Sequence, residues 1–173
     1  MAIIPIPLFD TLDRLCDTAL PSSYYTEQRQ VDVKKVIDFL KQYSGSISTF
    51  RAYRREMERL LHWTWLIADK SIINLERTDI ERYIVFCQKP PIAWIGTKTV
   101  SRFILSEQGI KIPNPAWRMF VATTSKSDFK YGIKADKKFY QLSDKSLQEI
   151  LTVSSSFFTH LVTENTIKRN PVL

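Results

Sequence analysis

A helical spacing of apolar residues over residues 143–163 constrains the fold of this chain more than any other feature. These residues recur at intervals of three and four and would form one stripe along a helix. They are Leu147, Ile150, Leu151, Phe158 and Leu161, and the small side chain of Ser154 occupies one further position of the stripe. Phe157 adds a second aromatic ring, and the chain has only 4 glycines in 173 residues. An apolar stripe of this kind is stable when it packs against other elements, so the segment predicts a helix within a larger helical assembly.

Two earlier segments show the same period. Residues 31–43 are expected to form one amphipathic helix, which Gly45 and Ser46 end. A long helix is expected from Thr49 to about Ala68, with Ser48 as its N-cap. The inward stripe of the long helix would be Phe50, Tyr53, Met57, Leu60, Leu61, Thr64 and Ile67. Its opposite face would carry Arg51, Arg55, Glu58 and His62.

A third helix is expected to begin at Thr78 and to end before Pro90 and Pro91. The run Thr78-Asp79-Ile80-Glu81 has the form of a capping box, which satisfies free backbone amides at a helix start and puts acids in the first turn. The helix would bury Ile80, Tyr83, Ile84 and Cys87. Residues 143–163 would then be the fourth main helix.

The sequence changes character between the third and fourth helices. Residues 88–142 contain prolines, glycines and several aromatic residues, so we expect an insertion that is packed rather than disordered. A short helix is expected at residues 97–107, and residues 1–30 are expected to form an N-terminal arm with a short helix at about 10–20. The predicted fold class is therefore all-α, a four-helix bundle over residues 31–173 with a partly ordered insertion at 88–142.

Composition narrows the class of protein. A hydrophobic content of 44% in a chain of this length supports one good core. Cys16 and Cys87 are too few for a disulfide framework, which favours a reducing compartment. The N-terminus lacks the basic start of a signal peptide, and no apolar run is long enough to span a membrane. The sequence predicts a cytoplasmic protein without a membrane partner.

The chain is basic, with a formal net charge of +7 and a pI of about 9.4. Residues 98–138 contain nine basic and three acidic residues, and residues 51–59 contain four arginines and two glutamates. An excess of basic residues is what binding to a polyanion requires, because neutralised phosphates release their counterions. The alternative is that these charges only keep the surface solvated.

Groups for catalysis are scarce. His62 and His160 are nearly a hundred residues apart, and the sequence has neither a Cys/His metal cluster nor a phosphate-binding glycine loop. Ser154, Ser155 and Ser156 form a run without a neighbouring base, and small side chains of this kind also permit close helix packing. We expect no catalytic residue, no metal and no cofactor in this chain.

The closing helix resembles the last helix of the core-binding domain of tyrosine recombinases, the phage integrase family. The resemblance lies in a Ser-capped helix, the Phe157-Phe158 pair with Leu161, and the exit through Asn170-Pro171. The long helix is similar to the opening helix of that domain, with matches at Thr49, Tyr53, Leu60 or Leu61, and Trp63. Together the matches cover residues 31–87 and 143–173.

The resemblance implies binding to double-stranded DNA. Ser48 and Thr49 would bind a phosphate at the helix start. Arg51 and Arg55, one turn apart, would enter the major groove, whereas Arg54 would meet the DNA backbone. Lys145 and Ser146 match DNA-contacting positions at the start of the closing helix. Glu149 departs from the family pattern, where many members have arginine or another polar residue.

The resemblance implies that this chain is the DNA-binding, core-binding domain of a site-specific tyrosine recombinase. The catalytic domain, with the tyrosine that attacks the scissile phosphate, would follow residue 173 and is absent from this chain. The full-length protein would clamp a recombination half-site for integration or excision and would self-associate on DNA. A different class remains open: a helical protein–protein interaction module that uses the aromatic-rich insertion.

Overall fold

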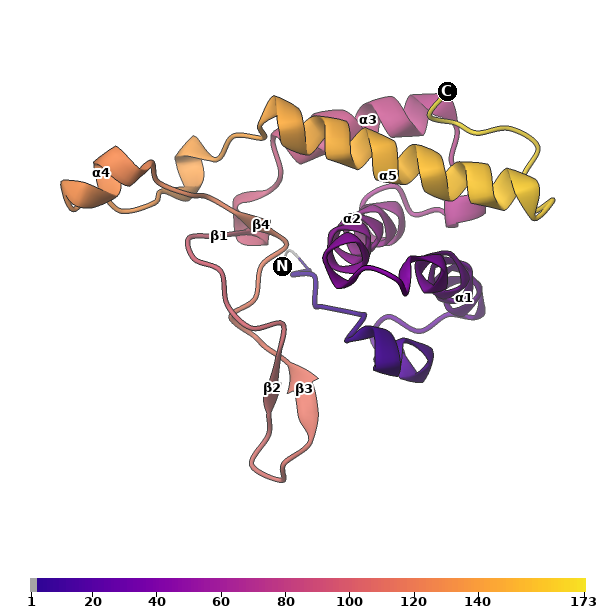
Figure 1. Cartoon of the computed structure of the whole chain (residues 1–173), viewed down its shortest axis with the longest axis horizontal. Coiled ribbons are helices and arrows are strands. Elements are labelled where there is room, and N and C mark those ends of the chain that lie inside the picture. Colours follow the sequence, from indigo (N-terminus) through magenta and orange to yellow (C-terminus); the bar gives the residue numbers. More distant parts are fainter. Residues whose placement is uncertain (1–2) are drawn as a thin grey trace. The chain divides into compact units, whose positions relative to one another are not determined.

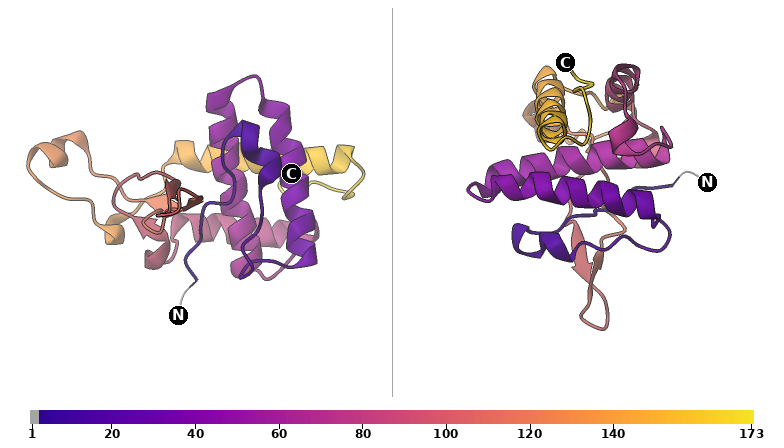
Figure 2. Two further views of the ribbon diagram at one scale, coloured as in Figure 1. Left: turned by 90° about the horizontal axis from the view of Figure 1, so that it is seen from below. Right: turned by 90° about the vertical axis from the view of Figure 1, so that its right-hand side faces the viewer.

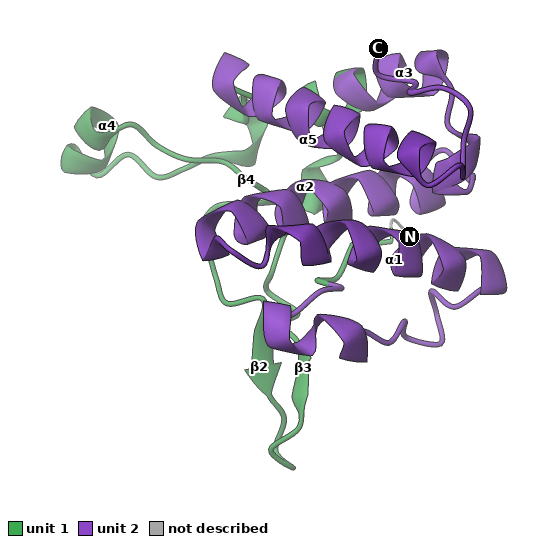
Figure 3. Cartoon of the chain, turned by 45° about the vertical axis from the view of Figure 1, so that its right-hand side comes forward, with its two compact units in different colours: residues 1–7, 85–143 green, residues 8–84, 144–173 purple. Residues whose placement is uncertain are grey.

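The computed structural model describes residues 3–173. The chain divides into two compact units (Figure 3). We call residues 8–84 and 144–173 the helical unit, and residues 1–7 and 85–143 the insertion unit. The second unit thus combines the segment between the third and fourth main helices with the start of the chain.

Four helices build the helical unit in two layers. α1 and α2 form an antiparallel hairpin, and α5 and residues 77–84 of α3 lie across it in the second layer (Figures 1 and 2). The helices are α1 (Glu27–Leu40), α2 (Ile47–Leu66), α3 (Arg77–Gln88) and α5 (Asp144–Thr163). Short 3-10 turns occur at Leu12–Asp17, Lys41–Tyr43 and Ile72–Asn74.

Aromatic and aliphatic side chains hold the two layers together. Phe39 of α1 packs against Phe157 of α5 with 5.3 Å between ring centroids, and Trp63 of α2 meets Tyr83 of α3 at the same separation. Met57 and Leu60 are fully buried, as the sequence predicted. Tyr53 is only half-buried, with its ring against those of Phe39 and Tyr43.

α2 is buried on every side over residues 56–65, which the sequence did not predict. Glu58 and His62 were expected on a solvated face, but their exposed fractions are 1% and 0%. The N-terminal arm covers them: the backbone N–H groups of Leu8 and Phe9 donate to Glu58 Oε1 at 2.8 and 2.7 Å. A helical period shows only that one face is apolar, and a polar face can be covered by a segment that satisfies its hydrogen bonds.

The helix starts differ from the predicted ones by one to four residues. Ser46, not Ser48, caps α2, with its Oγ accepting from the N–H of Thr49. α3 begins at Arg77, and Asp79 in its first turn accepts from the N–H of Glu76. Asp79 therefore caps the start of α3 from inside the helix, two residues earlier than the predicted box Thr78-Asp79-Ile80-Glu81, and the Asp79 N–H donates to the backbone carbonyl of Glu76 at 3.0 Å.

The insertion unit contains two small sheets. β1 (Ile95–Gly96) pairs in parallel with β4 (Phe120–Val121), and β2 (Phe103–Leu105) pairs antiparallel with β3 (Lys111–Pro113). The unit also has α4 (Lys126–Lys130) and 3-10 turns at Ile92–Trp94 and Lys137–Phe139. Its own aromatic core joins Phe86 to Trp94 and Phe120, and Phe120 to Tyr140, with ring centroids 5.1–6.1 Å apart.

The predicted all-α fold is wrong, because residues 95–121 carry these four strands. The short helix expected at 97–107 is replaced by the β2–β3 hairpin, in which Ile104 faces Ile112 across the ladder. Gly109 has a φ of 75°, a conformation that glycine adopts without strain and that turns the chain between the two strands. Apolar residues on both sides of a glycine turn favour a hairpin over a helix.

Gly96 shows why the parallel pair can form. A Cβ atom there would lie 3.2 Å from Cβ of Arg118, which is tighter than ordinary packing. The missing side chain lets the chain before β4 approach β1 closely, and the N–H of Ala122 donates to the carbonyl of Gly96 at 2.8 Å.

Across residues 3–173, no helix is both long enough and apolar enough to cross a membrane.

Candidate nucleic-acid interface

The predicted phosphate site lies in the first turn of α2. Ser48 is exposed and Thr49 is half-buried. The N–H of Thr49 already donates to the Ser46 cap at 3.3 Å, and the hydroxyls of Ser46 and Ser48 are also 3.3 Å apart. The helix start still presents positive dipole to solvent, but part of its donor set serves the cap.

Arg55 belongs to an ion-pair network that joins two helices. Its Nη2 lies 2.9 Å from Glu149 Oε2 on α5, and its Nε lies 3.0 Å from Glu56 Oε1. Glu56 is buried and also accepts from Arg59 at 3.0 Å. Buried carboxylates are retained when cations satisfy them in this way. Arg55 therefore has a structural role in this conformation, and Glu149 is its partner.

Arg54 also makes contacts within the helical unit. Its Nη1 donates to the carbonyl of Asp10 at 2.8 Å, and its guanidinium lies 5.6 Å from the ring centroid of Phe50. The side chain is half-buried and links the N-terminal arm to α2.

Arg51 and Lys145 are exposed, and each precedes one member of the Arg55–Glu149 pair on its own helix. Each lies four residues, or about 6 Å along its helix, before the paired residue of that helix. Ser146, next to Lys145, is half-buried. The Arg55–Glu149 contact thus joins the N-terminal halves of α2 and α5. Arg51, Arg55 and Lys145 are all exposed there, but Arg55 is held by Glu149 and Glu56.

The chain after α5 folds back along that helix. Asn170 Nδ2 donates to the carbonyl of Ser155 at 2.9 Å and to Thr159 Oγ1 at 3.0 Å. Its Oδ1 accepts from the N–H of Val172. Asn170 therefore anchors the tail to α5, and Arg77 Nη1 also donates to the carbonyl of Leu173 at 3.4 Å.

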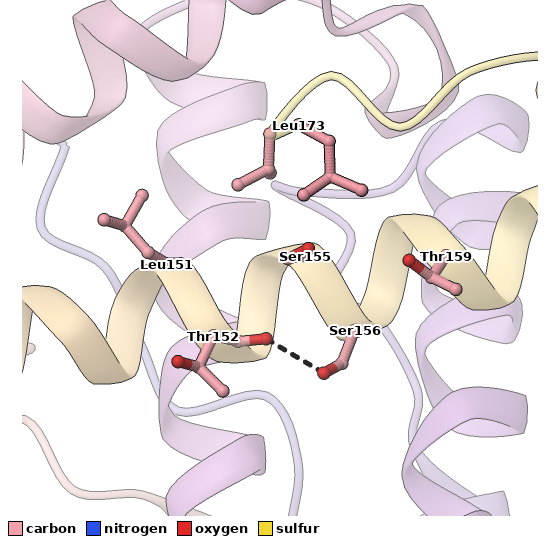
Figure 4. A pocket seen from close by; sticks show the side chains of 7 residues that line it. Leu151, Thr152, Ser155, Ser156, Thr159 and Leu173 are labelled. Carbon is pink, nitrogen blue, oxygen red and sulfur yellow. Dashed lines mark hydrogen bonds between the residues drawn. The ribbon is translucent and has the colours of Figure 1, made fainter.

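A pocket of about 650 Å³ lies between α5 and this tail (Figure 4). Hydroxyl and aliphatic side chains line it, and no described lining residue has a titratable side chain. The Ser156 hydroxyl donates to the carbonyl of Thr152 at 2.9 Å. The hydroxyls of Ser155 and Ser156 therefore lie among other hydroxyl and aliphatic side chains in the described lining.

The two histidines have different surroundings. His62 is buried, with its ring 5.5 Å from that of Tyr24, whereas His160 Nδ1 lies 2.8 Å from Nε2 of Gln42. No group of three or more His, Cys, Asp or Glu side chains in residues 3–173 has a geometry that would hold a metal ion.

The net charge is divided unequally between the two units. The helical unit has 15 basic and 15 acidic residues, whereas the insertion unit has ten basic and three acidic residues. The whole formal charge of +7 therefore belongs to the insertion unit. Seven of its basic residues are exposed lysines: Lys89, Lys98, Lys111, Lys126, Lys130, Lys134 and Lys138.

The seven site residues predicted from the sequence all lie in the helical unit, and none lies in the unit that carries the charge. The signal was present in the sequence as the surplus of basic residues over 98–138. Motif matching favoured α2 and α5 because their helical patterns are regular, whereas the insertion has no regular period.

Comparisons of the whole chain with protein-family models, with curated proteins and with solved structures give no match. Charge distribution and side-chain geometry are therefore the basis on which a function can be proposed.

Proposed function

We propose that the chain binds double-stranded DNA, mainly through phosphate contacts made by the insertion unit. In this proposal the chain is the DNA-binding part of a site-specific tyrosine recombinase. The full-length recombinase would clamp a recombination half-site for integration or excision. The chemistry would belong to a separate catalytic domain, and the chain itself would not be an enzyme.

The charge partition carries the proposal. Ten basic residues against three acidic ones in one compact unit produce a local positive potential that attracts a polyanion. Each phosphate that a lysine neutralises releases condensed counterions, so affinity should fall steeply as salt rises. A merely solvated surface does not require one unit to hold all of the net charge while the other is neutral.

The first turns of α2 and α5 would supply a second, weaker contact. Arg51 and Lys145 are exposed there and can reach a phosphate without breaking an ion pair shown in the structure. Arg55 would have to leave Glu149 and Glu56 before it could read a base, which costs the energy of both contacts. This second contact follows from the resemblance stated for the sequence, and its support in the structure is the exposure of Arg51 and Lys145.

The other candidate is a protein–protein interaction module, which the exposed aromatic rings of the insertion unit favour. Phe129, Tyr131 and Phe139 have exposed fractions of 78%, 82% and 79%. An apolar contact would depend weakly on salt, whereas counterion release makes DNA binding strongly dependent on it. The two functions therefore separate in one titration.

The test is fluorescence anisotropy of a labelled random duplex at several salt concentrations. We expect binding at low salt and a linear fall of log affinity with log salt. Lys126→Gln with Lys130→Gln should weaken binding and reduce the slope by about two, because each phosphate contact contributes close to one.

The matched control removes the same charge from the other unit. Lys34 and Lys41 are exposed residues at α1, and Lys34→Gln with Lys41→Gln should change affinity much less. The proposal is wrong if the parent chain does not bind duplex at low salt, or if both lysine pairs have equal effects.

A further inference from the structure

We propose that the insertion unit has a binding site for an unpaired DNA nucleotide, at a pocket beside Phe129. The site rests on the proposed DNA-binding function and names a substrate class that this function does not include. The observations that carry it are the position of the pocket, the chemistry of its lining, and the exposure of Phe129 and of two further rings in the same segment of the chain.

The pocket lies where the two parallel strands end. β1 leads into Thr97, Lys98 and Thr99, and β4 leads into residues 122–124; both segments line the pocket. The carboxyl ends of parallel strands meet at one edge, so the two strands deliver both segments to the same place. Phe129 of α4 and residues 132–135 after it complete the lining. In Figure 1, this segment and the β2–β3 hairpin extend in different directions from the β1–β4 pair.

The lining combines three kinds of group that a nucleotide needs. Lys98 and Lys134 are exposed cations, Phe129 offers an aromatic face, and threonine hydroxyls offer hydrogen bonds. No described lining residue is acidic. A cation neutralises the phosphate while an aromatic ring stacks on the base, the combination by which proteins bind single strands. The volume, about 710 Å³, lies within the usual range for small-ligand pockets.

The insertion unit has a packed aromatic core of its own, so the lack of a core does not explain its exposed rings. Phe86 of the same unit packs against both Trp94 and Phe120, and Trp94 Nε1 donates to the carbonyl of Ile3 at 3.1 Å. Tyr131 and Phe139, by contrast, have about four-fifths of their surface exposed, like Phe129. Exposed apolar groups gathered in one segment indicate a binding surface.

The charges around these rings select the ligand. Residues 126–139 contain five lysines, interleaved with the three aromatic residues, and two aspartates. One of the aspartates, Asp136, accepts from the N–H of Lys138 and so forms a local turn. The surplus of lysine favours a polyanion, and flat rings need exposed base faces. A duplex hides the faces of its bases, whereas an unpaired strand presents them.

The test compares an oligo-dT strand with a duplex of equal length by anisotropy, using the full chain. Phe129→Leu keeps an apolar side chain but removes the ring, and should weaken single-strand binding about 5- to 150-fold, the loss expected for one stacked base. Phe129→Trp should retain it. Duplex affinity should be nearly unchanged in both variants, because phosphates, not ring faces, hold the duplex.

Two controls make the result specific. Tyr25→Leu removes a half-exposed ring from the helical unit and should leave single-strand binding unchanged. A strand with 2-aminopurine should lose fluorescence on binding to the parent chain and lose less with Phe129→Leu, since stacking quenches that base. Circular dichroism checks that each variant is folded, which is expected because Phe129 is on the surface.

The outcomes distinguish this site from the proposed function. Duplex binding with single-strand binding that Phe129→Leu does not alter overturns the nucleotide site and leaves the proposed function standing. Single-strand binding that depends on Phe129, without duplex binding, supports the site and overturns the duplex proposal. Equal losses in Phe129→Leu and Phe129→Trp would mean that stacking is not involved, and tighter binding of an RNA strand would overturn the assignment to DNA.

Discussion

At the scale of single residues, spacing on a helix does not decide what an arginine does. Arg51 and Arg55 are one turn apart on α2, but only Arg55 meets a carboxylate of another helix, at 2.9 Å from Glu149. Arg54 lies between them in sequence and donates to the carbonyl of Asp10. Three neighbouring cations thus have three environments, which depend on what packs above each of them.

We expect Arg55→Ala to lower the free energy of unfolding by about 0.5–1.5 kcal/mol, because it removes two ion pairs that are partly exposed to solvent. Arg51→Ala should change stability by less than about 0.5 kcal/mol but reduce the salt slope of DNA binding by about one. Urea denaturation and anisotropy titrations measure the two effects. A loss of DNA affinity in Arg55→Ala with unchanged stability would contradict the structural role and restore Arg55 as a DNA contact.

The second prediction at this scale concerns Tyr43. Partial burial, followed by the charge of Tyr53 and a hydrogen bond with it, raises the pKa of Tyr43 to about 12. The unfolded chain would release this proton near pH 10, so the folded state binds the proton more tightly. Stability from this group is therefore complete below pH 10 and is lost as pH rises from about 10 to 12.

Tyr43→Phe should remove that part of the alkaline loss of stability. The measurement is urea unfolding of the parent and the variant at several pH values between 9 and 12. Other tyrosines and lysines titrate in both proteins, so the difference between the two curves isolates Tyr43. Parallel curves over the whole window would show that Tyr43 is not protonated more tightly in the folded state.

At the scale of elements, the N-terminal arm decides which residues of α2 are core. Glu58 lies on the polar side of that helix, yet it is 1% exposed because two backbone N–H groups of the arm donate to it. A charge-assisted hydrogen bond contributes more than a neutral one, and a lost acceptor leaves buried donors unsatisfied. The arm and α2 therefore depend on one carboxylate.

We expect Glu58→Ala to lower the free energy of unfolding by about 2–3 kcal/mol and to expose residues 8–10 to proteolysis. Glu164→Ala, which removes an exposed acid after α5, is the control and should change stability by less than about 0.5 kcal/mol. Chemical denaturation and limited proteolysis with mass spectrometry test both. Wild-type stability in Glu58→Ala would mean that the arm does not need this acceptor.

At the scale of the whole molecule, the long helices and the net positive charge are found in different units. The helical unit has the long helices and no net formal charge, and the insertion unit has short strands and a formal charge of +7. Each has its own aromatic cluster, centred on Phe157 in one and on Phe120 in the other. Loss of one cluster should therefore affect mainly the unit that contains it.

We expect Phe120→Ala to abolish most DNA binding while most of the helical circular dichroism signal melts as in the parent chain. Phe120 is 1% exposed, and truncation of a buried phenylalanine costs about 3–5 kcal/mol. Phe157→Ala, in the helical unit, should instead lower the temperature of the helical transition. Equal lowering of that transition by both variants would show that the two units unfold as one.

The sequence by itself determined the helices and the presence of excess positive charge. Periodic apolar residues locate α1, α2, α3 and α5 to within about four residues, because one stripe per helix is a local property of the chain. The surplus of basic over acidic residues in 98–138 is likewise a property of the sequence that does not depend on the fold. Neither prediction depends on which elements are in contact in the folded chain.

Only the tertiary structure decided where strands form, which charges pair and which faces are covered. The β1–β4 pair joins residues 95–96 to 120–121, and two-residue strands have no period to detect. Glu149 pairs with Arg55, 94 residues away, and Glu58 meets Leu8, 50 residues away. Contacts at such separations depend on how the whole chain packs, whereas periodicity and capping depend on neighbours along the helix. For that reason the seven residues predicted as a site are found on regular helices, and the exposed lysines and rings of the insertion unit emerged as a surface only with the fold.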